Sequence, residues 1–197
     1  MSSQPRRLIV GITGASGAIY GVRLLKLLQG SGIETHLVMS RSAKITLTQE
    51  LDIGAAEVSA LASVVHASDN IGASIASGSF RTMGMVNAPC STRSIAEIAS
   101  GVTSSLVTRA ADVVLKERRR LVLIVREAPL HLGHLRAMAA ATEIGAIVYP
   151  PVPAFYARPA SLEQMVDHTL GRVLDLFDIE NAAVSRWGGL NSIKNDE

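Results

Sequence analysis

This chain of 197 residues has one cysteine, few aromatic residues and no strong excess of charge. The single cysteine, Cys90, excludes an internal disulfide and fits a reducing compartment. Aromatic residues make up 4% of the sequence and the net charge is +2, so the aromatic platforms and dense basic faces of nucleic-acid-binding proteins are missing. No apolar run approaches the length of a membrane span, and residues 1–7 hold no signal-like segment. We expect a cytoplasmic protein without a nucleic-acid or membrane partner.

What the chain does have is enough apolar sequence for one substantial core. It is 48% hydrophobic and 18% charged, and its length is short for two ordinary domains. We therefore predict a single domain over residues 1–197. Residues 185–197, which contain the only tryptophan, Trp187, are expected to form a tail that packs at a subunit contact or is disordered.

Strand-like apolar runs alternate with longer amphipathic runs along the chain. This alternation is typical of βαβ units around a parallel sheet. It predicts an α/β fold with a three-layer, doubly wound sheet of the Rossmann-like or flavodoxin-like kind. Expected strands are 8–13, 35–39, 63–66, 84–87, 121–125 and 146–149, and expected helices are 19–28, 43–50, 94–100, 106–117, 132–143 and 162–177.

Ligands of doubly wound sheets bind beyond the carboxyl ends of the strands, so the residues that follow each strand are the candidates for a site. Residues 67–79 are small and polar without a clear period, and they exceed the usual length of a connection. We predict a mobile surface loop there, near a site or an interface.

The most specific local pattern is a branched apolar segment that runs into a turn with Gly11, Gly14 and Gly17. A strand, glycine turn and helix in this order bring backbone N–H groups and a helix N-terminus up to a phosphate. The spacing is not that of the dinucleotide fingerprint, and the second strand ends at Ser40 where a ribose-binding acid would be needed. No lysine of the P-loop type follows. These absences favour a mononucleotide such as FMN, although a tight turn without a ligand remains the alternative.

Other polar residues have an ordinary structural interpretation beside a functional one. Glu127 directly follows Arg126 and could form an ion pair with it, and Lys116 at a helix C-terminus is favoured by the helix dipole alone. His131 and His134 share a helix face, but no third metal ligand lies at suitable spacing. Cys90 has no histidine partner in its motif, and we expect a small buried residue.

Five segments together resemble one family, the UbiX flavin prenyltransferases. They are residues 11–18 (GITGASGA), 89–92 (PCST), 109–119 (RAADVVLKERR), 121–130 (LVLIVREAPL) and 150–159 (PPVPAFYARP). The resemblance extends from Arg7 to Trp187 with the order of motifs intact. Two positions depart from the family pattern, namely Arg120 in place of a proline and Asn87 in place of an apolar residue. A buried amide at Asn87 would need partners.

The resemblance implies that the protein binds FMN and dimethylallyl phosphate and joins the C5 unit to N5 and C6 of reduced FMN. It implies that no metal is needed and that the product serves a UbiD-type decarboxylase, in ubiquinone synthesis or aromatic-acid breakdown. It also implies a large homo-oligomer, commonly a homododecamer, with sites at subunit contacts.

The resemblance further implies roles for individual residues. Proton transfer is assigned to Ser16, Glu50 and Glu127. Flavin binding is assigned to Gly14, Ala15, Ser16, Ser40, Ser91, Thr92, Arg93, Ser94 and Arg126. The phosphate of the prenyl donor is assigned to Lys116, Arg126, Tyr156 and Arg172. The cations suit this chemistry independently, because a departing phosphate needs its charge neutralised.

Two other functions stay open at this point. An FMN-dependent cysteine decarboxylase of the same superfamily would need a catalytic histidine early in the chain and a Pro-x-Met-Asn-x-x-Met motif, neither of which occurs. A non-catalytic flavin carrier of the flavodoxin type would have more aromatic residues and an acidic surface.

Overall fold

The computed structural model describes residues 5–184, 186 and 189. Trp187 and nearly all of the expected tail lie outside the described residues. The chain divides into two compact units, Met1–Pro151 and Val152–Glu197, and each is described by itself. The single-domain organisation stays a prediction. Within the described ranges no helix is long and apolar enough to cross a membrane.

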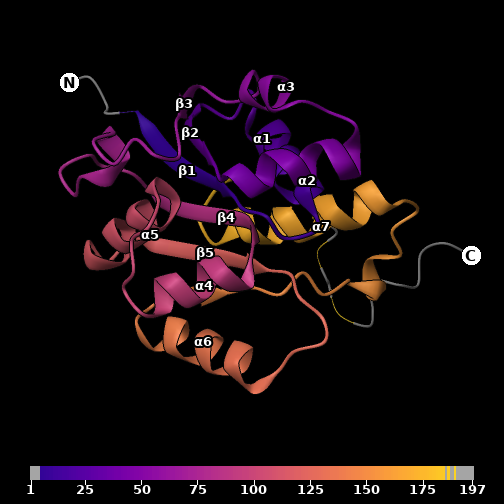
Figure 1. Ribbon diagram of the computed structural model, residues 1–197. Helices are drawn as coiled ribbons and strands as arrows, with labels where there is room; N and C mark the ends of the chain where they lie inside the picture. The colour runs from indigo at the N-terminus through magenta and orange to yellow at the C-terminus, as the bar shows by residue number, and fades with distance from the viewer. Residues whose placement is uncertain (1–4, 185, 187–188, 190–197) are drawn as a thin grey trace, which may run out of the picture. The chain divides into compact units, whose positions relative to one another are not determined.

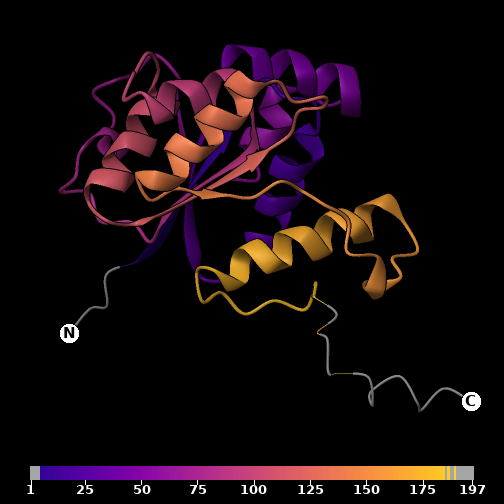
Figure 2. The ribbon, with the colours of Figure 1, turned by 90° about the horizontal axis from the view of Figure 1, so that it is seen from below.

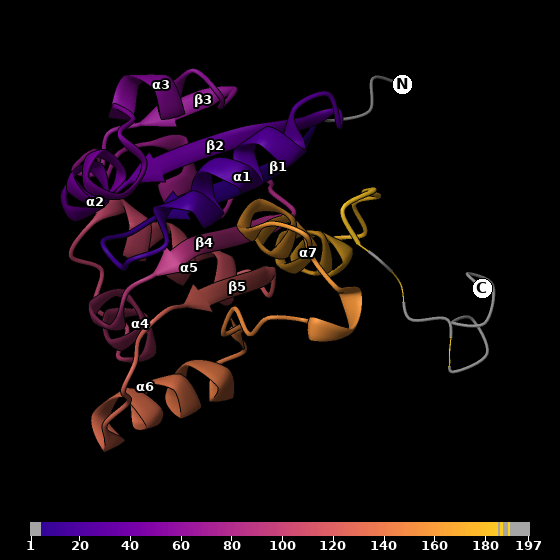
Figure 3. The ribbon, with the colours of Figure 1, turned by 90° about the vertical axis from the view of Figure 1, so that its right-hand side faces the viewer.

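The first unit is built on one sheet of six parallel strands in the order β3-β2-β1-β4-β5-β6 (Figure 3). Branched apolar residues are frequent in β1, β2 and β5, whereas β4 contains only one, Val86. All four strands are largely buried, as parallel strands covered on both faces require. The strands are β1 (Arg6–Ile12), β2 (Ile33–Met39), β3 (Val64–His66), β4 (Gly84–Cys90), β5 (Arg120–Val125) and β6 (Ile147–Val148).

Helices cover the sheet in two groups (Figures 1 and 2). One group follows β1 and β2, and in it α1 packs on β1, β2 and β4. The other group follows β4 and β5, and in it α4 packs against both α5 and α6. These helices are α1 (Ala18–Leu28), α2 (Arg41–Leu51), α3 (Ala55–Ser59), α4 (Thr92–Ala99), α5 (Leu106–Lys116) and α6 (Leu132–Glu143).

The strand order reverses between β1 and β4, since the chain moves from β1 outward to β2 and from β4 outward to β5. Right-handed crossovers then place the two groups of helices on opposite faces, which gives three layers. The point of reversal opens a crevice at the carboxyl ends of β1 and β4, where doubly wound sheets bind their ligands. The predicted fold class is confirmed, and all six predicted strands and six predicted helices are present within a few residues of their expected ends.

Residues 67–79 are mostly exposed, and Ser68 and Asp69 line the cavity described below, as expected of a surface loop near a site; its mobility stays a prediction. The segment also contains a short 3-10 helix, Ser74–Ala76, in which Ile75 is 1% exposed and belongs to a hydrophobic core cluster. Burial of one branched side chain fixes the middle of a segment whose composition is otherwise polar. The prediction missed this because a single isoleucine shows no periodicity.

The second unit contains a 3-10 helix, Phe155–Ala157, and α7 (Leu162–Asp175). Ser161 caps α7 by accepting a hydrogen bond from the backbone nitrogen of Gln164. The Asn181 amide donates to the carbonyl oxygen of Gly171 over 3.1 Å, which returns the following segment onto α7.

Candidate functional site

A cavity of about 500 Å³ lies at the carboxyl ends of β1, β2 and β4. Hydroxyl groups dominate its lining, and two arginines, one glutamate and one aspartate complete the polar set. Small polar side chains of this kind, close to the reversal of strand order, suit a phosphate-bearing ligand. The lining residues are Thr13, Gly14, Ser40, Arg41, Ser42, Ser68, Asp69, Ser91, Thr92, Arg93, Ser94, Glu97, Ser104, Ser105, Val107 and Thr108.

Two helices begin at this cavity. Ser40 caps α2 by accepting a hydrogen bond from the backbone nitrogen of Ala43 over 3.1 Å. Ser91 caps α4 in the same way, with the backbone nitrogen of Ser94 at 3.2 Å. The first turn of a helix leaves backbone N–H groups without helical partners and carries the positive end of the helix dipole. The residues after β2 and β4 therefore supply two anion-binding helix ends.

Thr13 joins the two loops that frame the cavity. Its side chain is 2% exposed, and its hydroxyl donates to the carbonyl oxygen of Pro89 over 2.9 Å. The same hydroxyl accepts from the backbone nitrogen of Ser91 over 2.8 Å. Gly14 follows, and a Cβ at this position would clash with the Cβ of Ser42. Gly14 is thus required by the close approach of α2 to the loop.

The predicted phosphate contact at the glycine turn before α1 stays a prediction, and the structure shows what the backbone donors there already bind. Gly17 ends the glycine turn with φ at 100°, a conformation that favours glycine. The Glu50 carboxylate of α2 already accepts hydrogen bonds from the backbone nitrogens of Gly17 and Ala18, over 2.8 and 2.9 Å. These two donors at the start of α1 are therefore already bonded, whereas the first turns of α2 and α4 lie at the cavity.

Arg126, which follows β5, lies over this glycine turn. A Cβ added to Gly17 would lie 2.8 Å from the Cδ of Arg126, so the arginine stem packs against the turn. Burial raises the pKa of the Glu50 carboxyl, but hydrogen bonds from Ser16 and from the Ala18 and Gly17 backbone, with the charge of Arg126, outweigh it and leave the pKa lowered. Burial also raises the pKa of Tyr20, and Arg126 opposes that rise. Ser16, Glu50 and Arg126 therefore form one polar group.

Among the described residues, Glu127 is not bonded to this group. Its side chain is exposed, and its carboxylate accepts a hydrogen bond from the backbone nitrogen of Ala128 over 3.0 Å. The structure gives no ion pair between Arg126 and Glu127, so the purely structural interpretation of Glu127 has no support. Cys90 is fully buried, and burial raises the pKa of its thiol to about 12. A thiol of this kind is protonated near neutral pH, in agreement with the expected packing role.

Lys116 lies far from the cavity within one chain. It ends α5 just before β5 begins, whereas Arg126 comes just after β5 ends. A six-residue strand spans about 20 Å, so the two residues lie at opposite edges of the sheet. The Lys116 ammonium is 2.6 Å from the carboxylate of Glu117.

Tyr156 and Arg172, the other two residues assigned to the prenyl donor, belong to the second unit. The Tyr156 ring is half exposed and meets the His168 ring edge-on, with centroids 5.7 Å apart. The Arg172 guanidinium is 2.6 Å from the carboxylate of Asp175, which also holds Arg186. Binding of a phosphate by Arg172 would compete with this ion pair.

His131, His134 and Asn87 were given no role in the site, and the structure shows the contacts of each. His131 caps α6 through its Nδ1 atom, and its ring stacks on His134. Among the described residues no group of three His, Cys, Asp or Glu side chains is arranged to hold a metal ion. Asn87 lies in the middle of β4, fully buried, and neither of its amide atoms has a hydrogen-bond partner there.

Sequence reasoning placed Thr13 among the candidates, since it follows the first strand, but it missed several other lining residues, among them Ser42, Glu97 and Thr108. Ser104 and Ser105 offered a signal, because a serine before the apolar start of a helix is typical of an N-cap. The others come to the cavity only through the packing of α2, α4 and α5, which no local pattern reveals.

Fold and cavity together define a doubly wound α/β protein with a hydroxyl-lined cavity at the starts of α2 and α4. A family model described as "Flavoprotein" matches residues 1–187. Flavin prenyltransferase UbiX of Escherichia coli strain K12 is 59% identical over 187 residues, which are 93% of this chain and 99% of that protein. Flavin prenyltransferase UbiX of Thauera aromatica is 52% identical over 183 residues, 93% of this chain and 94% of that protein. The chain belongs to the UbiX family of flavin prenyltransferases.

Solved structures agree with this assignment. A crystal structure of AnUbiX in complex with FMN and dimethylallyl pyrophosphate has a TM-score of 0.92 at 47% identity, covering 94% of this chain and 99% of that one. A dodecameric FMN-dependent UbiX-like decarboxylase from Escherichia coli O157:H7 has a TM-score of 0.90 at 48% identity, covering 93% of this chain and 100% of that one. The cysteine decarboxylase SpaF, at 17% identity and a TM-score of 0.60, with 83% and 97% of the two chains covered, shares the fold alone.

Proposed function

We propose that this protein joins the dimethylallyl group of dimethylallyl phosphate to N5 and C6 of reduced FMN and releases inorganic phosphate. The observation that carries the proposal is the hydroxyl-lined cavity at the α2 and α4 N-termini, next to the group of Ser16, Glu50 and Arg126. Family membership and the relative solved with FMN and dimethylallyl pyrophosphate support it.

FMN fits the cavity with its phosphate at the α2 and α4 ends. Ser40, Ser91, Thr92, Arg93 and Ser94 lie there and offer hydroxyls, backbone donors and a cation. Gly14, Ala15 and Ser16, which follow β1, and Arg126, which follows β5, would hold the rest of the flavin. When bound, FMN would supply the nucleophilic nitrogen and carbon.

Donor binding needs cations around a phosphate that leaves during the reaction. Arg126 is available beside the glycine turn, and we assign Lys116, Tyr156 and Arg172 to the same phosphate. Because Lys116 lies at the opposite edge of its own sheet, we propose that it serves the site of a neighbouring copy. A homododecamer, the assembly of one relative, would provide such neighbours. Arg172 is paired with Asp175, and Lys116 is paired with Glu117. On donor binding, the phosphate would replace each of these carboxylates as the partner of the cation.

Alkylation at N5 and ring closure at C6 each release a proton, so acceptors must be at hand. Glu50 has a lowered pKa and a hydroxyl neighbour in Ser16, which makes this pair the acceptor on the flavin side. Glu127 is exposed directly after Arg126 and is the acceptor we assign beside the departing phosphate.

A cysteine decarboxylase is the second candidate, because enzymes of that kind share the fold. They are too distant to support more, and the earliest histidine of this chain argues against it. His36 is 3% exposed and bonded to Glu34 and His66 within the sheet. It belongs to β2 and pairs with β3, away from the cavity lining. A non-catalytic carrier would not need Ser16 and Glu50 as proton acceptors beside the charge of Arg126.

We further propose that a UbiD-type decarboxylase receives the prenylated FMN and that the protein acts in the cytoplasm. Family membership supports the first proposal. The single buried cysteine supports the second, because it fits a reducing compartment.

The reaction is tested with reduced FMN and dimethylallyl phosphate under anaerobic conditions without added metal. We expect a flavin heavier by one C5 unit, detected by mass spectrometry, together with inorganic phosphate. Unmodified FMN after long incubation, with both ligands shown to be bound, would contradict the proposal. A parallel reaction with dimethylallyl pyrophosphate identifies the preferred donor.

A further inference from the structure

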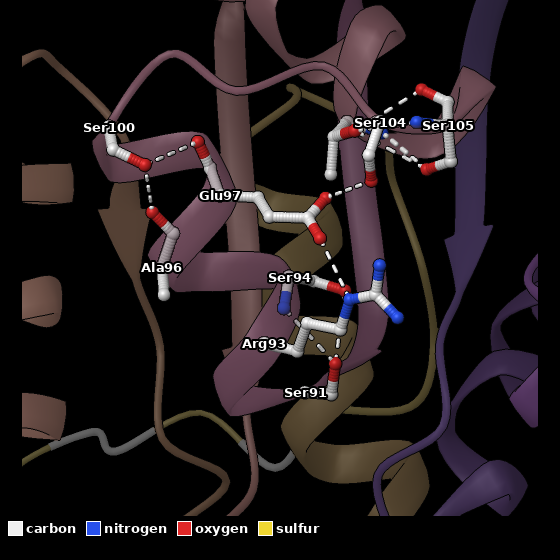
Figure 4. A network of polar contacts seen from close by, with 9 residues as sticks. Ser91, Arg93, Ser94, Ala96, Glu97, Ser100, Ser104 and Ser105 are labelled. Carbon is white, nitrogen blue, oxygen red and sulfur yellow. Dashed lines mark hydrogen bonds and ion pairs between the residues drawn. The ribbon is translucent and has the colours of Figure 1, made fainter.

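Glu97 lies at the centre of a bonded network on one side of the cavity (Figure 4). One carboxylate oxygen accepts from the Nε atom of Arg93 over 2.8 Å, and the other accepts from the Ser104 hydroxyl over 2.6 Å. The Glu97 side chain is 16% exposed, so it is held rather than free in solvent. This one residue connects α4 to the loop before α5.

The bond to Glu97 uses only part of the Arg93 guanidinium. The two terminal nitrogens have no partner within the described part of the chain, and the side chain is 80% exposed. In Figure 4 these nitrogens point away from Glu97. Arg93 belongs to the first turn of α4, which begins at Ser91. Its free donors therefore stand beside the helix end that we assign to the flavin phosphate.

The loop before α5 is fixed on both sides. Ser104 is bonded to Glu97, and Ser105 caps α5 by accepting from the backbone nitrogen of Thr108. The backbone nitrogen of Leu106 donates to the carbonyl oxygen of Ser68 over 2.8 Å. Ser68 and Ser104 both line the cavity, so these bonds make a connected wall at this end.

We propose that Glu97 is a positioning residue that directs Arg93 at the terminal phosphate of FMN and holds the wall behind it, so that the site selects FMN over riboflavin and FAD. Riboflavin lacks the phosphate that Arg93 contacts. In FAD the phosphate continues into a second nucleotide, which the wall of Ser68 and Ser104 obstructs. The inference rests on the proposed binding of FMN in this cavity.

The negative charge of Glu97 has a second, opposite effect. A carboxylate near a phosphate repels it, and if that repulsion dominated, removing the charge would strengthen binding. Positioning dominates here because both oxygens of Glu97 are bonded, one of them to the guanidinium itself. The two effects predict changes of opposite sign, which makes the inference testable.

The experiment compares the dissociation constants of FMN, riboflavin and FAD, measured by flavin fluorescence titration on the full chain. The variants are Glu97→Gln, Arg93→Gln, the double variant and Ser104→Ala. Ser100→Ala is the matched control, because this hydroxyl bonds only to the Ala96 and Glu97 carbonyl oxygens at the far end of α4, outside the cavity lining. Thermal unfolding of each variant checks that the fold is retained.

We expect Glu97→Gln to weaken FMN binding about tenfold, the size of a lost charge-assisted hydrogen bond. Riboflavin binding should stay within about twofold, as for a substitution that touches none of its contacts. The double variant should lose no more than Arg93→Gln alone, because the two residues act as a unit. Ser104→Ala should leave the bond between Arg93 and Glu97 intact. It should bring the dissociation constant of FAD closer to that of FMN.

Three results would overturn the inference. They are tighter FMN binding by Glu97→Gln, an equal loss for FMN and riboflavin, and an unchanged preference over FAD in both the Glu97 and Ser104 variants. Failure of the unsubstituted protein to bind FMN at all would instead overturn the proposed function, and the inference with it.

Discussion

The carboxylate of Glu50 lies 2.8 Å from the backbone nitrogen of Gly17, although the two residues are 33 positions apart. This contact ties the end of α2 to the start of α1. Gly17 has no side chain to cap its helix, so the carboxylate supplies both the hydrogen-bond acceptor and the negative charge that the helix N-terminus favours. The same carboxylate is a candidate proton acceptor. Glu50 would therefore both cap α1 and take part in the reaction.

Glu50→Gln is expected to lower the free energy of unfolding by about 1 kcal/mol near neutral pH, as for the loss of a helix cap. The pKa of Glu50 is lowered in the folded protein from its ordinary value of 4.5. Its contribution is therefore present above pH 4.5 and is lost as the pH falls through the lowered folded-state pKa. Urea unfolding from pH 3 to 7 should show the difference between the two proteins closing in acid. A difference that is constant over this range would mean that the charge of Glu50 has no part in it.

Thr13→Val should destabilise the protein by about 1–3 kcal/mol, because the exchange keeps the shape of a buried side chain but removes a hydroxyl that bonds both Pro89 and Ser91. FMN binding should weaken as well, since the two loops at the cavity lose their connection. Urea unfolding with and without FMN measures both effects. Thr142→Val is the control, a similar exchange on α6 whose hydroxyl bonds only to the carbonyl oxygen of Met138. Equal losses for the two variants would contradict the role of Thr13.

The fold could be predicted from the sequence because its signals are local. Branched apolar runs mark β1 and β5, a short apolar segment marks β4, and serines precede the starts of α2, α4 and α5. The segment around Ile75 could not be predicted in this way, because its order comes from one side chain buried against distant residues.

The candidate site was predictable in part, for a related reason. The residues after β1, β2 and β4 reach the cavity because parallel strands end at one edge of the sheet. The carboxylate of Glu50 at the α1 N-terminus was not predictable from the glycine pattern. The pattern indicates where a helix begins, but it does not indicate which group binds the backbone N–H groups there. Lys116 shows the limit of family resemblance. The motif identifies the residue, but the order of α5 and β5 shows that Lys116 and Arg126 lie at opposite ends of β5.

Glu127→Gln should bind both ligands normally and slow the reaction at least tenfold, because an amide keeps the shape of the side chain and cannot accept a proton. Single-turnover measurement of prenylated FMN, with ligand affinities determined separately, checks this. Glu143→Gln, at the exposed end of α6, is the control. An unchanged rate would remove Glu127 from the proton-transfer residues and leave Ser16 and Glu50.

Arg172→Met should raise the dissociation constant of dimethylallyl phosphate about tenfold and leave FMN affinity nearly unchanged, because a charge-assisted contact to one phosphate is lost. Asp175→Asn tests the competing ion pair. Without the charge of Asp175, Arg172 loses its competing ion pair and should bind the donor phosphate more readily. The affinity for dimethylallyl phosphate should therefore rise or stay equal. Loss of FMN affinity in the Arg172 variant with donor affinity retained would show that this residue belongs to the flavin site.

Lys116→Met should abolish donor binding if the lysine contacts the donor phosphate. Because the strand between Lys116 and Arg126 spans about 20 Å, we propose that Lys116 makes this contact in the site of a neighbouring copy. Chains carrying Lys116→Met and chains carrying Arg126→Met should each be inactive alone. Assembled together at equal amounts, they should recover about a quarter of the normal activity, because random neighbours leave one contact in four with both residues intact. Lys26→Met, in the last turn of α1, is the matched control and should stay active. Mixed assemblies that stay inactive would contradict a lysine supplied by the neighbour and return its partner to Glu117, with a structural role at the end of α5.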